Sequence, residues 1–193
     1  METIKIIVLT VLLAIVYGIA HDMVTTRVCV EYFTIGHPDI FHTTSPTKLA
    51  LGWGVVATWL PGLMIAVPLA VVARFPFWSK GGWPKLTARE LLPPAAVLML
   101  VMGVASLIAG IVGYVLASRG LIGFASDDYL SGLPRDKQVR FFADWYAHIT
   151  AYQVGYVGGI TLWVLTGYWR YKRWRALPRA TASATEIAAA PNH

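Results

Sequence analysis

The sequence contains little charge. Of its 193 residues only 13% are Asp, Glu, Lys or Arg, whereas 56% are hydrophobic, and the mean hydropathy is +0.58. Soluble globular domains carry about 25% charged residues. The scarcity of charge therefore excludes a disordered polar chain and argues against an ordinary soluble enzyme. It indicates an integral membrane protein whose apolar side chains face lipid.

Cysteine and the common catalytic motifs are also scarce. Cys29 is the single cysteine, which excludes an intramolecular disulfide, thioredoxin-like CxxC chemistry and covalent attachment of c-type haem. No GxSxG, HExxH, Walker or GxGxxG motif occurs, so hydrolases, zincins and nucleotide-binding enzymes lack their usual marks. We expect Cys29 to pack as a small apolar side chain.

Long apolar runs are what the sequence has in abundance. Four are evident, at about 4–20, 49–73, 92–117 and 146–169, and a membrane-spanning helix needs about 20 residues. We therefore predict an all-α integral membrane protein with a four-transmembrane-helix bundle over residues 1–175. Residues 176–193 are predicted to form a disordered cytoplasmic tail. Pro61 and Pro68 should kink the second span and free carbonyls that need partners.

The first span is predicted to continue as a long helix beyond the bilayer. Apolar and polar residues recur at helical spacing and predict one helix over about 4–35; they are Tyr17, His21, Val24, Val28, Glu31 and Ile35. The alternative is a cleaved signal peptide, because Lys5, the apolar stretch and Gly18-Ile19-Ala20 also match that pattern. The sequence leaves both interpretations open.

Small residues and cations indicate how the spans pack and which way they run. Small residues along the third span and Gly155-x-x-x-Gly159 in the fourth favour close helix contacts. The N-terminus, the second loop and the C-terminus carry ten Lys and Arg, against six on the other side. The positive-inside rule then predicts a multi-pass protein of the cell (inner) membrane with both termini cytoplasmic.

The basic cluster after the last span resembles a membrane anchor. Its cations alternate with Trp and Tyr, which is typical of side chains at the headgroup level and not of a nucleic-acid interface. The cations are Arg170, Lys172, Arg173, Arg175 and Arg179. We therefore expect the lipid bilayer, and no nucleic acid, as a partner.

The remaining polar residues gather near the non-cytoplasmic face, with four of the five histidines. The first and last loops share a side in either orientation, so segments over 100 residues apart converge there. The members are His21, Asp22, Arg27, Glu31, His37, His42, Asp144 and His148. Each also has a structural interpretation: an interhelical hydrogen bond for His21, a salt bridge between Arg27 and Glu31, and exposed loop positions for His37 and His42.

Taken together, these residues predict a metal site. His21 and His148 each lie near the end of a predicted span, so we expect them at the same depth in the membrane. We expect His37 to fold back from its loop as a further ligand. Imidazole suits zinc, copper and iron alike. Asp144 lies four residues before His148, where its carboxylate would orient the imidazole.

Two functions remain open. The first is a membrane enzyme or redox protein with a metal-dependent site on the non-cytoplasmic face. Its metal ligands would be His21, His148 and His37 for a Zn, Cu or Fe ion, and its catalytic residues would be Glu31, Asp144 and Arg27. The second is a non-enzymatic accessory or structural subunit of a larger membrane protein complex, in which the same residues form a structural network between helices.

Overall fold

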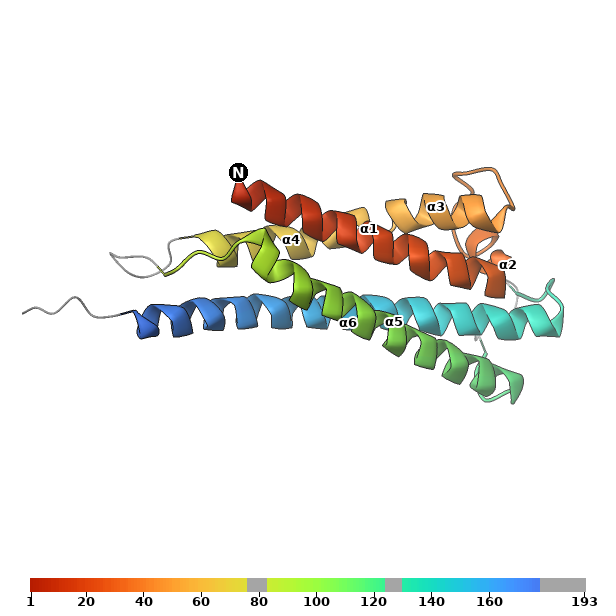
Figure 1. Cartoon of the computed structure of the whole chain (residues 1–193). Coiled ribbons are helices and arrows are strands. Elements are labelled where there is room, and N and C mark those ends of the chain that lie inside the picture. The colour runs from red at the N-terminus through yellow and green to blue at the C-terminus, as the bar shows by residue number, and fades with distance from the viewer. Residues whose placement is uncertain (76–82, 124–129, 178–193) are drawn as a thin grey trace, which may run out of the picture.

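The computed structural model describes residues 1–75, 83–123 and 130–177, and it is all-helical over these ranges. The helices are α1 (Glu2–Val28), α2 (Val30–Thr34), α3 (Pro46–Val56), α4 (Trp59–Arg74), α5 (Ala88–Ser118) and α6 (Arg135–Ala176). They form antiparallel passes along one axis, with α3 and α4 together making the second pass (Figure 1). The tail predicted to be disordered falls, from residue 178 onward, outside the described residues.

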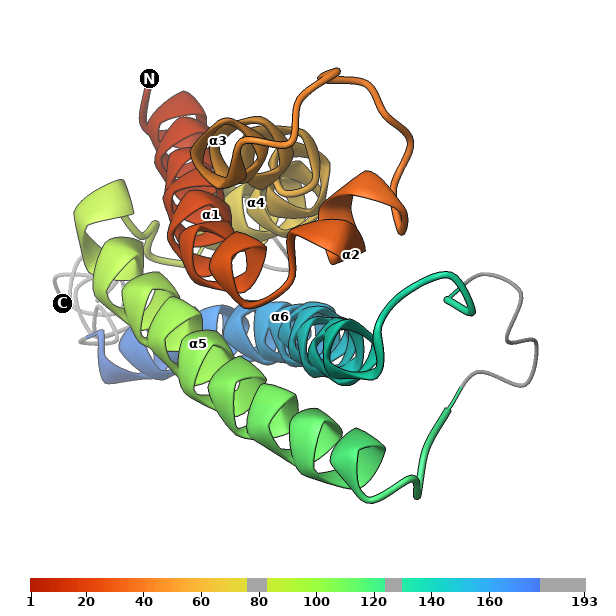
Figure 2. The same cartoon turned by 90° about the vertical axis from the view of Figure 1, so that its right-hand side faces the viewer.

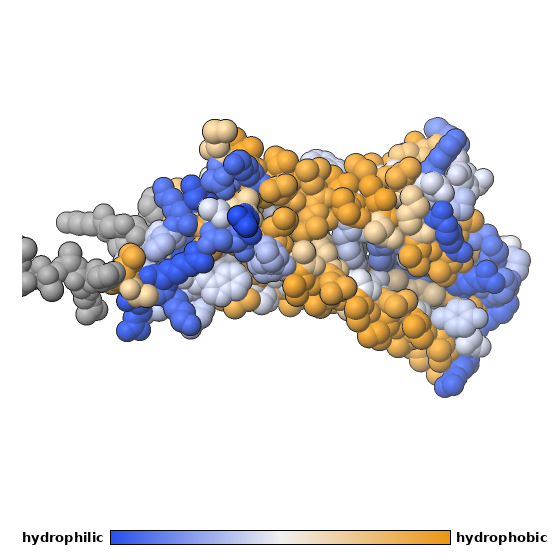
Figure 3. Space-filling view, viewed as in Figure 1, coloured by the Kyte–Doolittle hydropathy of each residue, from blue (hydrophilic) through white to orange (hydrophobic). Residues whose placement is uncertain are grey.

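Three passes are long and apolar enough to cross a membrane. They are Glu2–Val28, Pro46–Arg74 and Ala88–Ser118. On the face shown in Figure 3, apolar side chains form a band across the middle of the molecule, and polar side chains gather at both ends. These features indicate a membrane protein. The fourth predicted span, 146–169, lies within α6, which runs along the whole bundle (Figure 1). α6 is not among the three helical passes that are apolar enough to cross a membrane.

The predicted helix over 4–35 is wrong in one respect, because it breaks at Cys29. α1 ends at Val28, Cys29 has an extended backbone with φ −148° and ψ 98°, and α2 begins at Val30. The spacing that predicts one continuous helix therefore holds only as far as Val28. The last part of the predicted extension is a separate short helix that runs in another direction (Figure 2).

Side chains on both sides of the break account for it. The hydroxyls of Thr25 and Thr26 donate to backbone carbonyls one turn earlier in α1, a pattern that bends helices. Beyond the break, Tyr32 and Phe33 of α2 are buried, and the ring centroid of Tyr32 lies 5.2 Å from that of Phe141 in α6. The break thus allows α2 to bury aromatic surface that a straight helix would leave outside the bundle.

The second pass is interrupted where proline chemistry predicts a disturbance. α3 ends at Val56 and α4 begins at Trp59. Pro61 has no N–H to donate to the carbonyl of Ala57, four residues earlier. Tyr152 of α6 donates its hydroxyl to that carbonyl over 3.3 Å. The freed carbonyl therefore finds its partner on another helix.

Small residues on α5 bring α6 close. Ser106, Gly113 and Ala117 are buried, and a Cβ atom at Gly113 would lie 2.8 Å from the carbonyl oxygen of Phe142. No larger side chain fits at this position without a shift of the α6 backbone. The close packing predicted for the third apolar run is therefore confirmed, and it is α6 that lies against it (Figure 2).

Arg170 is not an interfacial anchor, contrary to the expectation from its basic neighbours. It is fully buried, and its guanidinium donates to the backbone carbonyls of Val72, Phe75, Trp83 and Pro84. Val72 and Phe75 lie at the C-terminal end of α4, where helical carbonyls lack partners within the helix. Arg170 therefore ties the end of α4, and the segment that precedes α5, to α6.

Candidate metal centre

His21, Asp22 and His148 form a compact cluster of metal-ligating side chains. Their ligand atoms all lie within 4.8 Å of one another. Asp22 Oδ1 lies 3.2 Å from Nδ1 of His21 and 3.3 Å from Nε2 of His148. The two imidazole rings are nearly perpendicular, and their centroids are 4.5 Å apart. The convergence of the first and last helices that the topology predicts is thus present in the structure.

A hydrogen bond fixes which nitrogen of His148 faces Asp22. Nδ1 of His148 lies 2.8 Å from the backbone carbonyl of Asp144. A carbonyl only accepts, so Nδ1 carries the proton, and Nε2 of the neutral ring presents its lone pair to Asp22. The sequence predicts that the Asp144 carboxylate orients His148. In the structure the backbone carbonyl of Asp144 makes that contact instead. On a helix, the carbonyl of one residue points toward the side chain of the residue four positions later, so this spacing also allows a backbone contact.

His21 is held in the same way by Ser106 of α5. Nε2 of His21 lies 2.8 Å from Oγ of Ser106, and the Ser106 hydroxyl donates to the carbonyl of Ala147 over 3.0 Å. Since this bond uses the single hydroxyl proton, Oγ accepts from Nε2. In the neutral ring, the lone pair of His21 is therefore on Nδ1, which faces Asp22.

The cluster thus gathers two imidazole lone pairs and a carboxylate oxygen at one point. Such electron-rich atoms repel one another unless a cation or a proton lies among them. Histidines that bind metal characteristically give their second N–H to a fixed acceptor, which sets the tautomer and the ring orientation. Both histidines here have such an acceptor. Three protein ligands that leave a position open are typical of catalytic zinc sites, whereas structural sites are closed by four.

A cavity of about 90 Å³ adjoins all three residues of the cluster. Aromatic and aliphatic side chains make up most of its wall. They include Tyr17, Tyr32, Trp53, Ile65, Met102 and Tyr156. The hydroxyl of Tyr17 is buried and has no hydrogen-bond partner in the described part of the chain. The cluster therefore adjoins a partly open and largely apolar space.

His37, the third expected ligand, lies outside the cluster but lines the same cavity. Its Nδ1 donates to the backbone carbonyl of Tyr32 over 3.0 Å, and its ring centroid lies 4.7 Å from that of Trp53. His37 therefore forms part of the cavity wall. His42, in the same loop, is exposed.

Glu31 and Arg27 do not form the salt bridge that their spacing predicts. Nζ of Lys137 lies 3.0 Å from the Glu31 carboxylate, whereas Arg27 donates to the Met23 carbonyl and to the Thr47 hydroxyl. The break between α1 and α2 removes the helical geometry that would pair them. Partial burial is the largest single effect and acts to raise the pKa of Glu31, but the hydrogen bond from Lys137, the hydrogen bonds from the Glu31 backbone and Cys29, and the charge of Lys137 together hold that pKa below its usual value.

Cys29 packs as the sequence predicts. It is 1% exposed, and burial raises the pKa of its thiol to about 12. A thiol with such a pKa carries almost no thiolate at neutral pH, so Cys29 is a poor nucleophile and a poor metal ligand.

Asp22 and Ser106 complete the arrangement, although the sequence pattern did not single them out for these roles. The adjacent His21-Asp22 pair is a signal for Asp22, since both side chains leave the same turn of one helix. Ser106 belongs to a row of small residues, which predicts packing only. Its role depends on which helix lies against α5 at that level.

Comparisons with known proteins gave no match: no family model, curated protein or solved structure is significantly similar to this chain. The functional interpretation therefore rests on the geometry of the cluster.

Proposed function

We propose that this chain is a metal-dependent membrane protein in which His21, Asp22 and His148 hold a Zn, Cu or Fe ion for an enzymatic or redox reaction. One observation carries the proposal: each imidazole has a fixed acceptor for one N–H, so that in the neutral rings both lone pairs are directed at the same carboxylate oxygen. In an ordinary structural His–Asp contact the N–H would point at the carboxylate. Two histidines and one carboxylate are the donor set of catalytic zinc and of non-haem iron.

We further propose that α6 is a fourth span and that the metal site lies near the non-cytoplasmic face. In support, α6 runs beside the apolar passes over their whole length (Figure 1). Its C-terminal end, with Lys172, Arg173 and Arg175, lies at the same end of the bundle as the N-terminus. The excess of Lys and Arg at this end favours a cytoplasmic location for both termini.

Metal analysis of the purified protein tests the proposal. The chain is expressed in medium with zinc, copper and iron and purified without chelators, and its metal content is measured by mass spectrometry. We expect close to one ion per chain, and loss of that ion in His148→Ala and Asp22→Asn. His42→Ala, which removes an exposed histidine, is the control that keeps the ion. A metal-free wild type, or unchanged metal in the two cluster variants, would overturn the proposal.

The accessory-subunit hypothesis makes a different prediction for the same material. If the cluster is only a structural network, the chain is metal-free and remains in a stable complex with other membrane proteins after mild extraction. Native mass spectrometry distinguishes the two cases. A metal-loaded species without partners supports the metal site, and a metal-free complex of fixed composition supports the accessory role.

A further inference from the structure

We infer that the molecule received by this metal site is a membrane-dissolved amphiphile whose polar end enters from the lipid side, between α6 and the second pass. The inference rests on the proposed metal site. It adds the class of ligand and the direction from which it arrives.

The size of the cavity limits what fits beside the cluster. Its volume is about 90 Å³, and a single water needs about 10–15 Å³ of such cavity space. His21, Asp22 and His148 all line it, so an open coordination position faces this space. The cavity therefore has room for a head group of several non-hydrogen atoms beside the cluster, and a long alkyl chain attached to that head group would extend beyond the cavity.

The inner wall of the cavity suits an amphiphile and not a polar solute. Ile65, Met99 and Met102 belong to its wall, and such side chains offer water no hydrogen bonds. The buried hydroxyl of Tyr17 lacks a partner in the described residues, and its ring stacks on His21 with centroids 5.7 Å apart. A ligand oxygen between the metal and Tyr17 would satisfy this hydroxyl.

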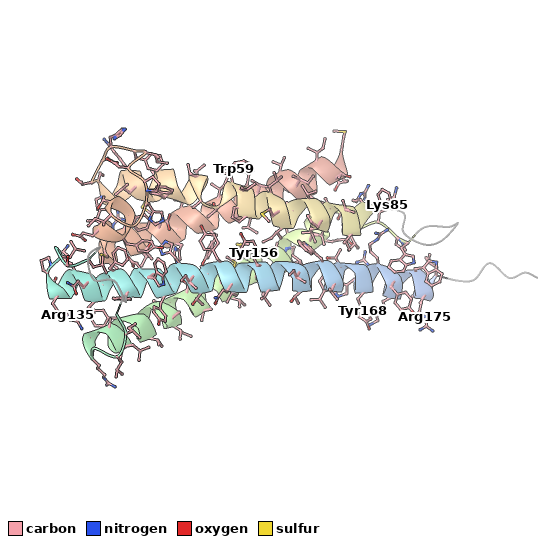
Figure 4. All side chains as sticks on the ribbon, turned by 180° about the vertical axis from the view of Figure 1, so that it is seen from behind. Trp59, Lys85, Arg135, Tyr156, Tyr168 and Arg175 are labelled. Carbon is pink, nitrogen blue, oxygen red and sulfur yellow. The ribbon has the colours of Figure 1, made fainter. Side chains whose placement is uncertain are left out.

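The exposed residues of the cavity wall lie within a predicted membrane span. Tyr152 and Tyr156 of α6 line the cavity and are 37% and 40% exposed. Ala57 and Pro61 line it from the interrupted second pass. Both tyrosines fall inside the predicted span 146–169, so their exposed sides meet lipid. Figure 4 shows Tyr156 on the side of α6 that faces the second pass.

A second groove does not serve the site in the same way. It lies between α1, α5 and α6, has a volume of about 610 Å³ and is lined almost wholly by apolar side chains. Of the three cluster residues, it reaches His21 but neither Asp22 nor His148. A molecule in this groove would contact one of the three metal-ligating residues. The cavity between α6 and the second pass, which all three residues line, is therefore the route to the metal.

Two hydroxamates with the same metal-binding head and different tails test the inference. The chain is loaded with Co²⁺ in lipid nanodiscs, and the visible spectrum of bound Co²⁺ reports binding of acetohydroxamate or dodecanohydroxamate. We expect the long-chain probe to change the spectrum at a concentration at least tenfold lower. Equal or better binding of acetohydroxamate would overturn entry from lipid.

Matched glycine variants separate entry by this route from simple concentration of the probe in the membrane. A Cβ at Gly155 would meet the flexible end of Met102 at 2.9 Å, inside the cavity wall, whereas a Cβ at Gly167 would meet Val72 at 3.7 Å, outside that wall. We expect Gly155→Phe to weaken dodecanohydroxamate binding at least tenfold and Gly167→Phe to leave it unchanged. Equal behaviour of the two variants would contradict the route.

A further variant guards against misfolding. If Gly155→Phe no longer binds Co²⁺, Tyr17→Phe replaces it, because it removes only the unpaired hydroxyl. We expect Tyr17→Phe to keep the Co²⁺ spectrum and to bind dodecanohydroxamate several-fold more weakly, and unchanged binding would contradict the role of Tyr17. Failure of the wild type to bind Co²⁺ is a separate outcome, which would overturn the metal site and this inference with it.

Discussion

Nε2 of His148 lies 3.3 Å from Oδ1 of Asp22, across 126 positions of the sequence. The contact joins α6 to α1, the last helix of the chain to the first. Because Nδ1 of His148 donates to the Asp144 carbonyl, the atom that faces Asp22 is a lone pair in the neutral ring. This pairing of two electron-rich atoms is the basis of the metal proposal.

Ser106 should affect metal affinity although it is not a ligand. Ser106→Ala removes the acceptor that holds Nε2 of His21, and loss of such a supporting hydrogen bond weakens metal affinity about 10- to 100-fold. Competition with a chromophoric chelator measures the change. Ser118→Ala, which changes an exposed serine of the same helix whose hydroxyl donates to the Val115 carbonyl, is the control. Equal affinity of both variants would show that Ser106 has a packing role only.

Arg170 should be essential for stability at the opposite end of the bundle. Arg170→Leu leaves four backbone carbonyls without their donor. Hydrogen bonds of a charged group are worth about 1.5–3 kcal/mol each, so we expect a loss of about 3 kcal/mol or more. Arg170→Lys should not rescue it, since an ammonium lacks the planar fork.

Thermal unfolding in detergent measures this effect. The control is Arg175→Leu, because Arg175 is exposed on the same helix (Figure 4), and it should unfold at the wild-type temperature. An Arg170→Leu variant as stable as Arg175→Leu would contradict the carbonyl-binding role.

The pair of Glu31 and Lys137 predicts a pH dependence of stability. Although partial burial acts in the opposite direction, the bond from Lys137 lowers the pKa of Glu31 from 4.5, and the bond to Glu31 raises that of Lys137 from 10.5. A carboxyl whose pKa is lower in the folded protein than in the unfolded chain stabilises the fold at pH values above its unfolded-state pKa. This contribution is lost as the pH falls through the folded-state pKa. The raised pKa of Lys137 contributes stability at pH values below 10.5. This contribution is lost as the pH rises through the folded-state pKa of Lys137.

We therefore expect Glu31→Gln to unfold at a lower temperature than wild type at pH 7. The difference should shrink as the pH falls below 4.5, where the wild-type carboxylate also becomes neutral. Asp136→Asn, at an exposed position with a 3.9 Å pair to Arg140, is the control with little effect at either pH. A difference that stays constant across the range would indicate a packing effect and not the ion pair.

Cys29 should react with thiol reagents only when the protein unfolds. Its side chain is buried, and burial raises its pKa to about 12, so the thiolate fraction at neutral pH is about a thousandfold below that of a free thiol near pKa 8.5. Mass spectrometry after timed treatment with N-ethylmaleimide measures the rate. Fast labelling of the folded protein in detergent would contradict the burial of this residue between α1 and α2.

Some parts of the site follow from the sequence and others do not. His21 and His148 are predictable because the predicted four-span topology places the ends of their predicted spans on the same side. Asp22 needs only its adjacency to His21. The break at Cys29 is not predictable from spacing, because Tyr17, Val24 and Ile35 keep the helical period through it. What breaks the helix is the burial of Tyr32 and Phe33 against α6.

The burial of Arg170, at the opposite end of the bundle, is also not predictable from the sequence. Its neighbours in the sequence are cations and aromatic residues, and a solvated anchor has that composition. Only the approach of the end of α4 and of the segment before α5 supplies the carbonyls that make burial of a guanidinium favourable.

By itself, then, the sequence determined the all-helical class, the apolar passes and the side of the bundle on which the histidines gather, because these depend on composition, period and span count. The tertiary structure decided which nitrogen of each histidine faces Asp22, that Ser106 and the Asp144 carbonyl hold them, and that Glu31 pairs with Lys137. Those features depend on which residues of distant helices meet at the same depth. Helical spacing within one segment carries no information about that.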